Sequence, residues 1–520
     1  MYLADHARLT PDKPAVIMAE SGAVMTYAEL NDRSNRLARY LYAQGLRRGD
    51  HIAIFMENNI RFVEVCWAAL RSGLYFTTVN RYLPADEAAY VVQDCEARVL
   101  VSSLARAEVA GQLNDLIPSC PKRLMVDGVI DGWEPYEDAI AAFPAQPLAE
   151  EFLGESMLYS SGTTGRPKGI LRPLTNLGMT EGGRLRLSRL DRYNGSPDMV
   201  YLSPAPLYHA APNAFVLSTQ FMGGTVVVME RFDALNALRL IEQYCVTHSQ
   251  WVPTMFVRML KLPEDERTAF DLSSHRVAIH AAAPCPVEVK RQMIEWWGPI
   301  LYEYYAGTEG SGSTFIESED WLAHPGSVGR AALGVLHVCD EEGRELPPGE
   351  AGTVYFEREE IPFVYHNDPA KTRAAQHPDH PTWSALGDVG YLDADGYLYL
   401  TDRKAFMIIS GGVNIYPQAI EDVLIAHPKV ADVAVVGVPH AEMGEAVQAV
   451  IETAPGVAPS RALADELIAF ARVRLAHYTV PRAIDFIDEM PRLPTGKLYK
   501  RGLRDEYWKD GRLAKAIPID

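Results

Sequence analysis

The sequence predicts an α/β protein with a large N-terminal domain of βα-layered sheets, a small β subdomain at the end of that domain, and a small α+β C-terminal domain. Short β-prone runs alternate with amphipathic helical patterns along residues 26–283, glycine-rich hairpin patterns occupy residues 326–399, and a compact α+β pattern begins after residue 405. Alternating strands and helices are typical of parallel sheets that carry helices on both faces. A chain of 520 residues also exceeds the usual size of one hydrophobic core, so two or more domains are expected.

The N-terminal domain is expected to contain a well-marked early helix. Thr26-Tyr27-Ala28-Glu29 is a capping-box pattern, in which the hydroxyl and the carboxylate satisfy backbone N–H groups at the helix start. Leu30, Leu37 and Leu41 then recur on one helical face. The elements expected after this helix are strands at 51–55, 98–101, 225–229 and 277–280 and helices at 62–70 and 234–244.

Two changes of pattern mark the β subdomain and the domain junction. Thr353-Val354-Tyr355-Phe356, set among glycines and Asp-Gly dipeptides, predicts antiparallel hairpins. The junction is expected at residues 402–405, between an N-terminal domain of residues 1–401 and a C-terminal domain of residues 406–520. The C-terminal domain is expected to hold helices at 419–426 and 460–475 and strands at 430–438 and 446–452.

Composition and charge exclude several classes of protein. Apolar residues make up 48% of the chain and charged residues 22%, so a buried core is expected and disorder is not. The formal net charge of −19 argues against non-specific binding to nucleic acid or to anionic membranes. Six scattered cysteines without a C-x-x-C pair indicate reduced thiols. No secretory signal and no run of about twenty apolar residues is visible, so a cytoplasmic location without an integral membrane segment is expected.

The segment Tyr159–Gly169 has the composition of a phosphate-binding loop. Its glycines let main-chain N–H groups approach a ligand closely, and its hydroxyl groups and a lysine can bind phosphate oxygens. It lacks the Gly-Lys-Ser/Thr ending of a Walker loop. Taken alone, a Gly/Ser/Thr cluster is also consistent with a surface linker. The residues expected to contact phosphate are Ser160, Ser161, Gly162, Thr163, Thr164, Gly165 and Lys168.

The order of residues in this segment resembles the phosphate-binding signature of the acyl-adenylate-forming (AMP-binding) superfamily, which includes acyl-CoA synthetases. Three further motifs follow in the family's order, so the resemblance extends over almost the whole chain. The amino-acid sequence of residues 281–286 and 409–417 is most similar to that of bacterial fatty-acyl-type CoA synthetases. The resemblance implies that the loop grips the β- and γ-phosphates of ATP. It also implies that the C-terminal domain is mobile and that residues 402–405 form the hinge.

The second motif is Tyr304–Gly310. The resemblance implies that Tyr305 lies against the adenine, that Thr308 contacts the α-phosphate, and that Glu309 holds Mg²⁺ together with Thr164. These residue types suit such roles, because an aromatic face stacks on a purine and a carboxylate oxygen suits a hard cation shared with phosphates. The alternative is a tyrosine pair packed in the core before a turn.

The third and fourth motifs are Leu386–Gly390 and Leu493–Lys497. The resemblance implies that Asp388 accepts hydrogen bonds from the ribose hydroxyls and that Arg403 places a cation near ribose or phosphate. It implies that Lys497, a point charge on a flexible stem, bridges the incoming carboxylate and the α-phosphate. Without the family pattern, Asp388 is also consistent with a residue that caps a turn. Arg403 and Lys497 are then consistent with exposed surface charges.

The resemblance also implies an acyl pocket and a site for coenzyme A. His209 would shape the acyl pocket and gate the carboxylate, although a buried structural histidine is the alternative. The other histidines show no zinc-ligand pattern. The implied acyl-pocket residues are Tyr208, His209, Ala281 and Gly307, and the implied CoA residues are Gly411, Gly412, Tyr478 and Arg482.

The chain departs from the family pattern at four positions. Ala405 stands where Asp or Lys is usual in the hinge, and Met443 replaces an aromatic residue before Gly444. Thr479 and Val480 stand where basic residues often contact the phosphates of coenzyme A. These departures bear on the hinge and on the CoA contacts rather than on the nucleotide motifs.

The resemblance predicts an ATP-dependent carboxylate–CoA ligase, which forms an acyl-AMP with release of pyrophosphate and then an acyl-CoA with release of AMP. The implied catalytic residues are Lys497, Thr308, Glu309 and His209, and the implied small molecules are ATP, Mg²⁺, coenzyme A as co-substrate, and a carboxylic acid. One alternative is an adenylating enzyme that passes the acyl group to an amine or a carrier protein, and another is a non-catalytic nucleotide-binding sensor. The sequence does not specify which acid is used. It is compatible with a homodimer but does not specify the oligomeric state.

Overall fold

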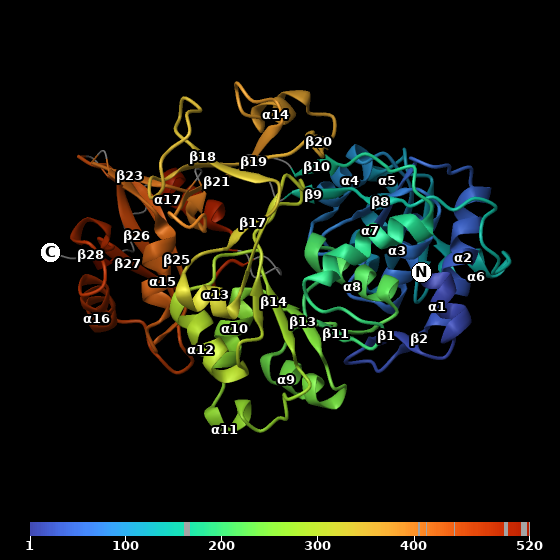
Figure 1. Cartoon of the computed structure of the whole chain (residues 1–520), viewed down its shortest axis with the longest axis horizontal. Coiled ribbons are helices and arrows are strands. Elements are labelled where there is room, and N and C mark those ends of the chain that lie inside the picture. Colours follow the sequence, from blue (N-terminus) through green and yellow to red (C-terminus); the bar gives the residue numbers. More distant parts are fainter. Residues whose placement is uncertain are drawn as a thin grey trace.

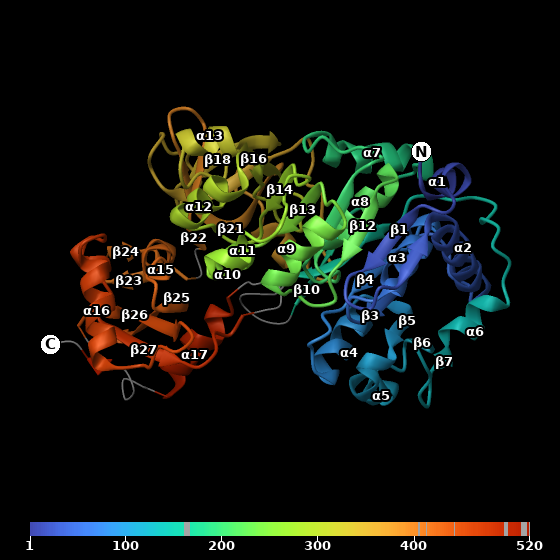
Figure 2. The same cartoon turned by 90° about the horizontal axis from the view of Figure 1, so that it is seen from below.

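The computed structural model describes residues 1–160, 167–403, 406–411, 413–440, 442–492, 498–510 and 517–518. Figures 1 and 2 both show a large domain, coloured blue to yellow, with a small orange-to-red domain at one end of it. The predicted fold class, a large domain of parallel sheets with a smaller C-terminal domain, is confirmed.

The first sheet of the large domain is parallel, with strand order β7-β6-β5-β3-β4-β8. Alternate residues of its central strand face opposite sides. Ile52 and Ile54 pack into the core formed with α2 and α3, whereas Ala53 and Phe55 pack into the core formed with α4 and α5. The bounds are α1 (Leu3–Leu9), α2 (Tyr27–Ala43), β3 (His51–Phe55), α3 (Ile60–Arg71), β4 (Tyr75–Thr78), α4 (Ala85–Asp94), β5 (Ala97–Ser103), η1 (Leu104–Arg106), α5 (Ala107–Leu116), β6 (Lys122–Val126), β7 (Glu134–Pro135), α6 (Tyr136–Ala141) and β8 (Glu155–Ser156).

The second sheet has strand order β17-β16-β15-β14-β13-β11-β12-β1-β2. Its six central strands are parallel, and antiparallel strands close both edges. The bounds are β1 (Pro14–Met18), β2 (Val24–Thr26), α7 (Met179–Asp191), β11 (Val200–Ser203), α8 (Ala210–Met222), β12 (Thr225–Val228), α9 (Ala234–Gln243), β13 (His248–Trp251), α10 (Pro253–Leu260), α11 (Glu264–Arg267), β14 (Val277–His280), α12 (Val287–Trp297), β15 (Leu301–Glu303), β16 (Ser313–Glu317), α13 (Ser318–Ala323) and β17 (Arg330–Leu333).

Two smaller antiparallel sheets complete the large domain. The predicted β subdomain is a four-stranded sheet of order β18-β19-β21-β22, and a second, three-stranded sheet has the order β20-β10-β9. The bounds are β9 (Leu158–Ser160), β10 (Lys168–Leu171), β18 (Val335–Cys339), β19 (Gly352–Glu357), β20 (Val364–Tyr365), α14 (Pro369–Ala374), β21 (Trp383–Leu392) and β22 (Leu398–Arg403).

The small domain is built on a mixed six-stranded sheet in which β25 and β26 form a long antiparallel pair. One face of this sheet packs on α15 and α16, and the other packs on α17. The bounds are β23 (Ile408–Ser410), β24 (Val413–Ile415), α15 (Pro417–Ile425), β25 (Val430–His440), β26 (Gly444–Thr453), α16 (Arg461–Arg472), η2 (His477–Thr479), β27 (Ala483–Ile487), α17 (Lys500–Asp510) and β28 (Ile517–Pro518).

The elements predicted from hydrophobic periodicity are present within a few residues of their expected bounds. The capping box at Thr26 forms as predicted, with both side-chain hydrogen bonds present. Residues 404–405 of the expected hinge lie outside the described residues, so the junction at 402–405 stays a prediction. In the part of the chain that the structure describes, no helix combines the length and the apolar character needed to cross a membrane.

A buried ion pair lies under the carboxyl end of β15. Lys290 Nζ of α12 is 2.6 Å from Glu303 Oε2, and the two side chains are 0% and 6% exposed. Burial raises the pKa of Glu303. His280 Nε2 is 3.6 Å from the same oxygen, but burial and then Lys290 hold the pKa of His280 well below its usual value, so Lys290 is the cation of this group. Glu303 directly precedes Tyr304 and Tyr305, so the pair fixes the strand end that carries them.

We expect Lys290→Met to lower the free energy of unfolding by about 3–5 kcal/mol, because it leaves Glu303 buried without its cation. Urea denaturation at neutral pH would measure this loss. The double variant Lys290→Met/Glu303→Leu should lose markedly less, because it removes both charges from the same space. A single variant as stable as the parent would contradict this account.

Candidate active site

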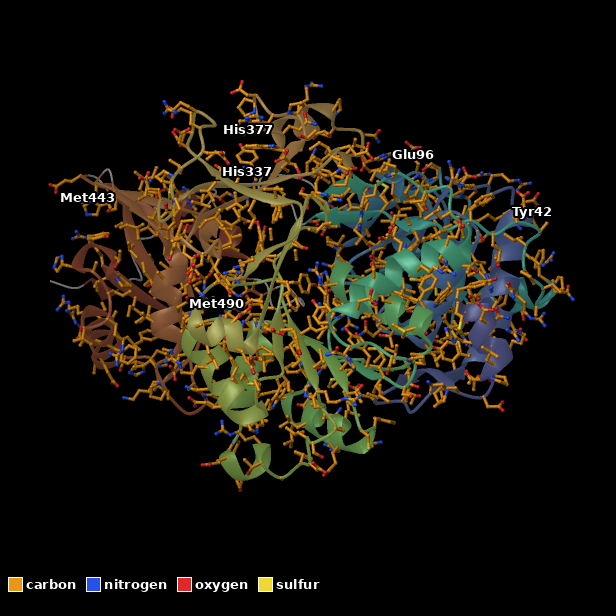
Figure 3. All side chains as sticks on the ribbon, viewed as in Figure 1. Tyr42, Glu96, His337, His377, Met443 and Met490 are labelled. Carbon is orange, nitrogen blue, oxygen red and sulfur yellow. The ribbon has the colours of Figure 1, made fainter. Side chains whose placement is uncertain are left out.

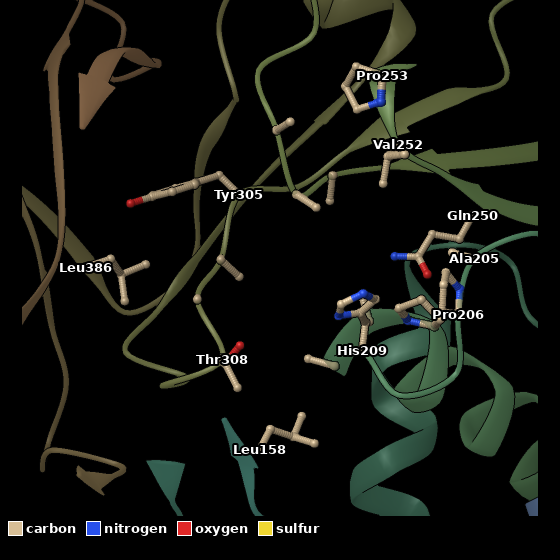
Figure 4. A pocket seen from close by; sticks show the side chains of 18 of the residues that line it. Leu158, Ala205, Pro206, His209, Gln250, Val252, Pro253, Tyr305, Thr308 and Leu386 are labelled. Carbon is tan, nitrogen blue, oxygen red and sulfur yellow. The ribbon is translucent and has the colours of Figure 1, made fainter. Parts of the chain in front are cut away.

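One cavity of about 2520 Å³ lies between the large sheet, the β subdomain and the small domain. Parallel strands point their carboxyl ends to the same edge of a sheet, and in open α/β sheets ligands bind there. The segments that follow β11, β13, β14 and β15 all line this cavity. Figure 4 shows His209 and Gln250 on one side of it and Tyr305 and Thr308 on the other.

The turn after β14 is strained. Ala282 has φ of +77°, a left-handed conformation that is unfavourable for a residue with a side chain. It lies beside Ala281, one of the predicted acyl-pocket residues, and both line the cavity. Strained backbone of this kind is concentrated at functional sites, where the surrounding structure maintains it.

The predicted adenine and ribose residues are in direct contact. The Tyr305 hydroxyl donates a hydrogen bond of 2.6 Å to Asp388 Oδ2. Tyr305 belongs to the segment after β15, whereas Asp388 lies on β21 of the β subdomain. The Tyr305 ring packs against Phe356 with ring centroids 6.0 Å apart. The structure therefore joins two motifs that are 83 residues apart in the sequence.

The rest of the Tyr304–Gly310 motif lines the same cavity. The Tyr365 hydroxyl donates a 2.8 Å hydrogen bond to Glu309 Oε1 and so orients that carboxylate. Gly307 is closely packed, since a Cβ there would lie 2.5 Å from Leu386 Cδ2 and 2.8 Å from Glu309 Oε2. A side chain at position 307 would therefore push aside the side chains of Leu386 and of Glu309, the predicted metal ligand.

The predicted phosphate loop connects the paired strands β9 and β10. Its central residues, Ser161, Gly162, Thr163, Thr164 and Gly165, lie outside the described residues, as does the side chain of Ser160. Lys168 lines the cavity, and its Nζ is 2.7 Å from Asp368 Oδ2. This hydrogen bond raises the pKa of Lys168 and lowers that of Asp368. No sequence pattern pointed to Asp368, which also caps the N-terminus of α14.

The segment that carries Lys497 is bracketed by two ion pairs. Residues 493–497 lie outside the described residues, but Arg492 and Lys500 on either side of them line the cavity. Arg492 Nη2 donates to Asp432 Oδ1 at 2.6 Å, and Lys500 Nζ is 2.8 Å from the buried Glu421. These pairs were not predicted, because their partners are distant in the sequence and carry no motif.

The predicted acyl-pocket residues Tyr208, His209, Ala281 and Gly307 all line the cavity. Tyr208 is held by its backbone, whose carbonyl accepts a 2.7 Å hydrogen bond from Thr78 Oγ1. The Tyr208 and His209 rings are in contact, with centroids 4.2 Å apart. Sequence reasoning missed Gln250 on β13, whose Nε2 donates a 3.1 Å hydrogen bond to the Tyr304 hydroxyl on this wall.

The predicted CoA residues are not brought to this cavity. Gly411 forms the turn between β23 and β24 with φ of +58°, and Tyr478 and Arg482 are exposed. None of these three residues lines the cavity, and Gly412 lies outside the described residues. Gly411 N donates to Met443 O at 2.8 Å, and Figure 3 shows Met443 at the outer edge of the small domain.

The described lining of the cavity in this acidic protein holds as many basic as acidic side chains, eleven Lys and Arg beside eleven Asp and Glu. Its lining includes the cations Lys168, Arg172, Arg358, Lys371, Arg492 and Lys500. Such a local cluster can bind a polyanion despite a net charge of −19 for the chain. The side chain of Arg403, another predicted cation, lies outside what the structure describes, although its backbone pairs with Asp388. Among the described residues, no group of three or more His, Cys, Asp or Glu side chains is arranged to hold a metal ion.

The two-domain fold and the cavity at the carboxyl ends of its strands define a nucleotide-binding α/β enzyme with a separate small domain. Residues 3–362 match the model of the AMP-binding enzyme family, and residues 419–497 match that of the AMP-binding enzyme C-terminal domain. The chain therefore belongs to the AMP-binding enzyme family, and the predicted class of AMP-forming ligase, which uses ATP, is confirmed.

Similar proteins support the same assignment over the full length. A long-chain-fatty-acid–CoA ligase of Mycobacterium tuberculosis is 31% identical over 97% of this chain and 97% of its own. A fatty acid–[acyl-carrier-protein] ligase of Streptomyces coeruleorubidus is 31% identical over 97% of this chain and 95% of its own. The crystal structure of ATP-bound MatB from Rhodopseudomonas palustris superposes with a TM-score of 0.81, at 28% identity over 98% of this chain and 99% of that one.

We expect Tyr305→Phe to raise the KM for ATP about tenfold, with a smaller effect on kcat. The ring remains, but the hydrogen bond that orients the Asp388 carboxylate is lost. Steady-state kinetics with varied ATP would measure the change. Tyr391→Phe is the matched control, since Tyr391 lies on the same strand as Asp388 but does not line the cavity. An unchanged KM for ATP in Tyr305→Phe would contradict the inference that this hydrogen bond contributes to ATP binding.

Proposed function

We propose that this chain is a carboxylate–CoA ligase that works in two half-reactions. In the first, a carboxylate oxygen attacks the α-phosphorus of ATP, the bond to the β-phosphate oxygen breaks, and pyrophosphate leaves. In the second, the thiol of coenzyme A attacks the acyl carbon, loses its proton, and displaces AMP to give a thioester. The observation that carries the proposal is that Thr308 and Glu309 share one cavity with Arg492 and Lys500, the residues around the Lys497 segment.

The first half-reaction brings two anions together, so positive charge must be placed between them. We assign this role to Lys497, which would bridge the carboxylate and the α-phosphate, with Thr308 donating to that phosphate. At about 4 Å and an effective dielectric near 20, one opposite charge contributes on the order of 4 kcal/mol. Tyr305 would stack on the adenine, and Asp388 would bind the ribose, with Arg403 near ribose or phosphate. His209 and Tyr208 would line the entry to the acyl pocket.

The phosphate tail would be held by Lys168 and by the loop residues Ser160–Gly165. Glu309 and Thr164 are the proposed Mg²⁺ ligands, because a carboxylate and a hydroxyl oxygen suit a hard cation that is shared with phosphates. The Glu309 carboxylate fits this role, since it lines the cavity and is oriented by Tyr365. When bound, Mg²⁺ would neutralise part of the phosphate charge.

The second half-reaction requires a different arrangement of the small domain. Gly411, Tyr478 and Arg482 do not line the cavity, whereas Arg492 and Lys500, which flank the Lys497 segment, do. We infer that the present arrangement serves the first half-reaction. Rotation at residues 402–405 would then withdraw Lys497 and bring Gly411, Gly412, Tyr478 and Arg482 to the thiol of coenzyme A.

Two alternatives remain distinguishable by experiment. A carrier protein or an amine could replace coenzyme A as acceptor, and the similarity to a carrier-protein ligase favours testing the carrier protein first. A non-catalytic nucleotide sensor would not release pyrophosphate in response to an acid.

The absence of disulfides, with all six cysteines free, supports the proposed cytoplasmic location.

We expect Lys497→Ala to reduce adenylate formation by at least about 100-fold, while thioester formation from a supplied acyl-adenylate stays near the parental rate. Acid-dependent exchange of pyrophosphate into ATP measures the first step, and acyl-CoA formation measures the second. Lys122→Ala is the control, since Lys122 is a partly exposed lysine that pairs with Glu134 on the first sheet and does not line the cavity. Equal loss of both half-reactions would count against the role of Lys497.

The acid and the acceptor can be identified with the same parent enzyme. Acid-dependent pyrophosphate release should be detected for at least one class among short-chain, long-chain, aromatic and sterol-side-chain acids. With that acid, AMP and product should accumulate with coenzyme A and less with an amine or a carrier protein. No release with any class would favour the sensor, and a faster reaction with another acceptor would replace coenzyme A.

A further inference from the structure

Lys261 joins the two domains. It follows α10 of the large domain, and its Nζ donates hydrogen bonds to Val430 O at 2.6 Å and to Ala431 O at 3.0 Å in the small domain. Its stem starts from a fixed point, because Phe256 and Met259 of the same helix are fully buried. The lysine also lies at a helix C-terminus, where a positive charge is favoured.

On the small-domain side of this contact, strand β25 is irregular. The pairing of β25 with β26 is irregular between Val430 and Asp432, so the chain bulges at Ala431. A bulge redirects backbone groups that a regular strand would use within the sheet. Here the redirected carbonyls meet the Lys261 ammonium. Burial lowers the pKa of Lys261, and the nearby charges of Asp432 and Glu452 oppose that shift only in part.

The contact is continuous with the segment that carries Lys497. Asp432 directly follows the two carbonyls and binds Arg492, the last described residue before 493–497. Glu452 accepts a 2.7 Å hydrogen bond from the backbone N–H of Met490, two residues before Arg492. The strand end that Lys261 holds is therefore the same one that fixes the start of the 493–497 segment.

We propose that Lys261 is a positioning residue that holds the small domain in the arrangement for adenylate formation, and that this contact is released before thiol transfer. The inference rests on the proposed two-step function. Lys261 does not need to touch substrate, because it acts through Asp432 and Arg492. Its effect should accordingly appear in one half-reaction and not in the other.

The test compares Lys261→Met, Lys261→Arg and Lys13→Met with the parent enzyme. Methionine keeps an apolar stem without the charge, and arginine can still donate to two carbonyls. Lys13 is the matched control, because its Nζ donates to the carbonyl of Pro197 within the large domain. Acid-dependent pyrophosphate exchange, thioester formation from a supplied acyl-adenylate, and amide hydrogen exchange over residues 253–262 and 428–433 are measured for each.

For Lys261→Met we expect adenylate formation to fall about tenfold in kcat, since a shift of about 1.4 kcal/mol in the domain equilibrium changes it by that factor. The KM for ATP should change little, because the proposed adenine and ribose contacts lie in the large domain. Thioester formation should be unchanged or faster, and both peptides should exchange faster. Lys261→Arg should recover most of the activity, and Lys13→Met should match the parent.

A parental rate of adenylate formation in Lys261→Met overturns the inference, as does an equal loss in both half-reactions. A parent enzyme without acid-dependent pyrophosphate exchange would instead count against the proposed function. In that case the hydrogen-exchange arm still decides the contact: unchanged protection of both peptides in Lys261→Met overturns it, and faster exchange confined to this variant supports it.

Discussion

Two anions, a carboxylate and a nucleotide triphosphate, must meet in a protein whose own net charge is −19. This electrostatic constraint explains much of the site. The cavity brings cations of the large and the small domain together, and several of them are already paired with protein carboxylates. Lys168 with Asp368 and Lys500 with Glu421 keep their positions through these pairs. Preorganised charge of this kind costs little rearrangement during reaction.

The second feature is the division of the site between domains. The large sheet contributes the segments after β11, β13, β14 and β15, the β subdomain contributes Asp388, and the small domain contributes the flanks of 493–497. The Tyr305–Asp388 hydrogen bond joins the first two of these parts, and the Lys261 contact with β25 joins the third. The first contact and the Lys261–Val430 hydrogen bond are both partly buried, whereas the Lys261–Ala431 hydrogen bond is exposed. The second contact also lies between domains, so it is the one suited to a reversible arrangement.

The packing beneath the site accounts for its rigidity. Glu303, at the end of β15, is held by the buried Lys290, and Gly307 is pressed against Leu386 without room for a side chain. Ala282 is kept in a left-handed conformation by the turn after β14. The buried charges and the left-handed Ala282 cost free energy, and the well-packed cores on both faces of the large sheet offset that cost.

The sequence alone determined the elements and the chemistry at each motif. Periodicity gave the helices and strands within a few residues, because burial on one face depends on local spacing. Residue order at Tyr304–Gly310 and Leu386–Gly390 was enough to predict residues that line the cavity. Tertiary structure alone decided which of these residues touch. The contacts lie far apart in the sequence: 83 residues separate Tyr305 from Asp388, 200 separate Lys168 from Asp368, and 169 separate Lys261 from Val430. Such pairs follow from how the strands are ordered in the sheets and how the domains meet, and no local pattern of side chains encodes that order.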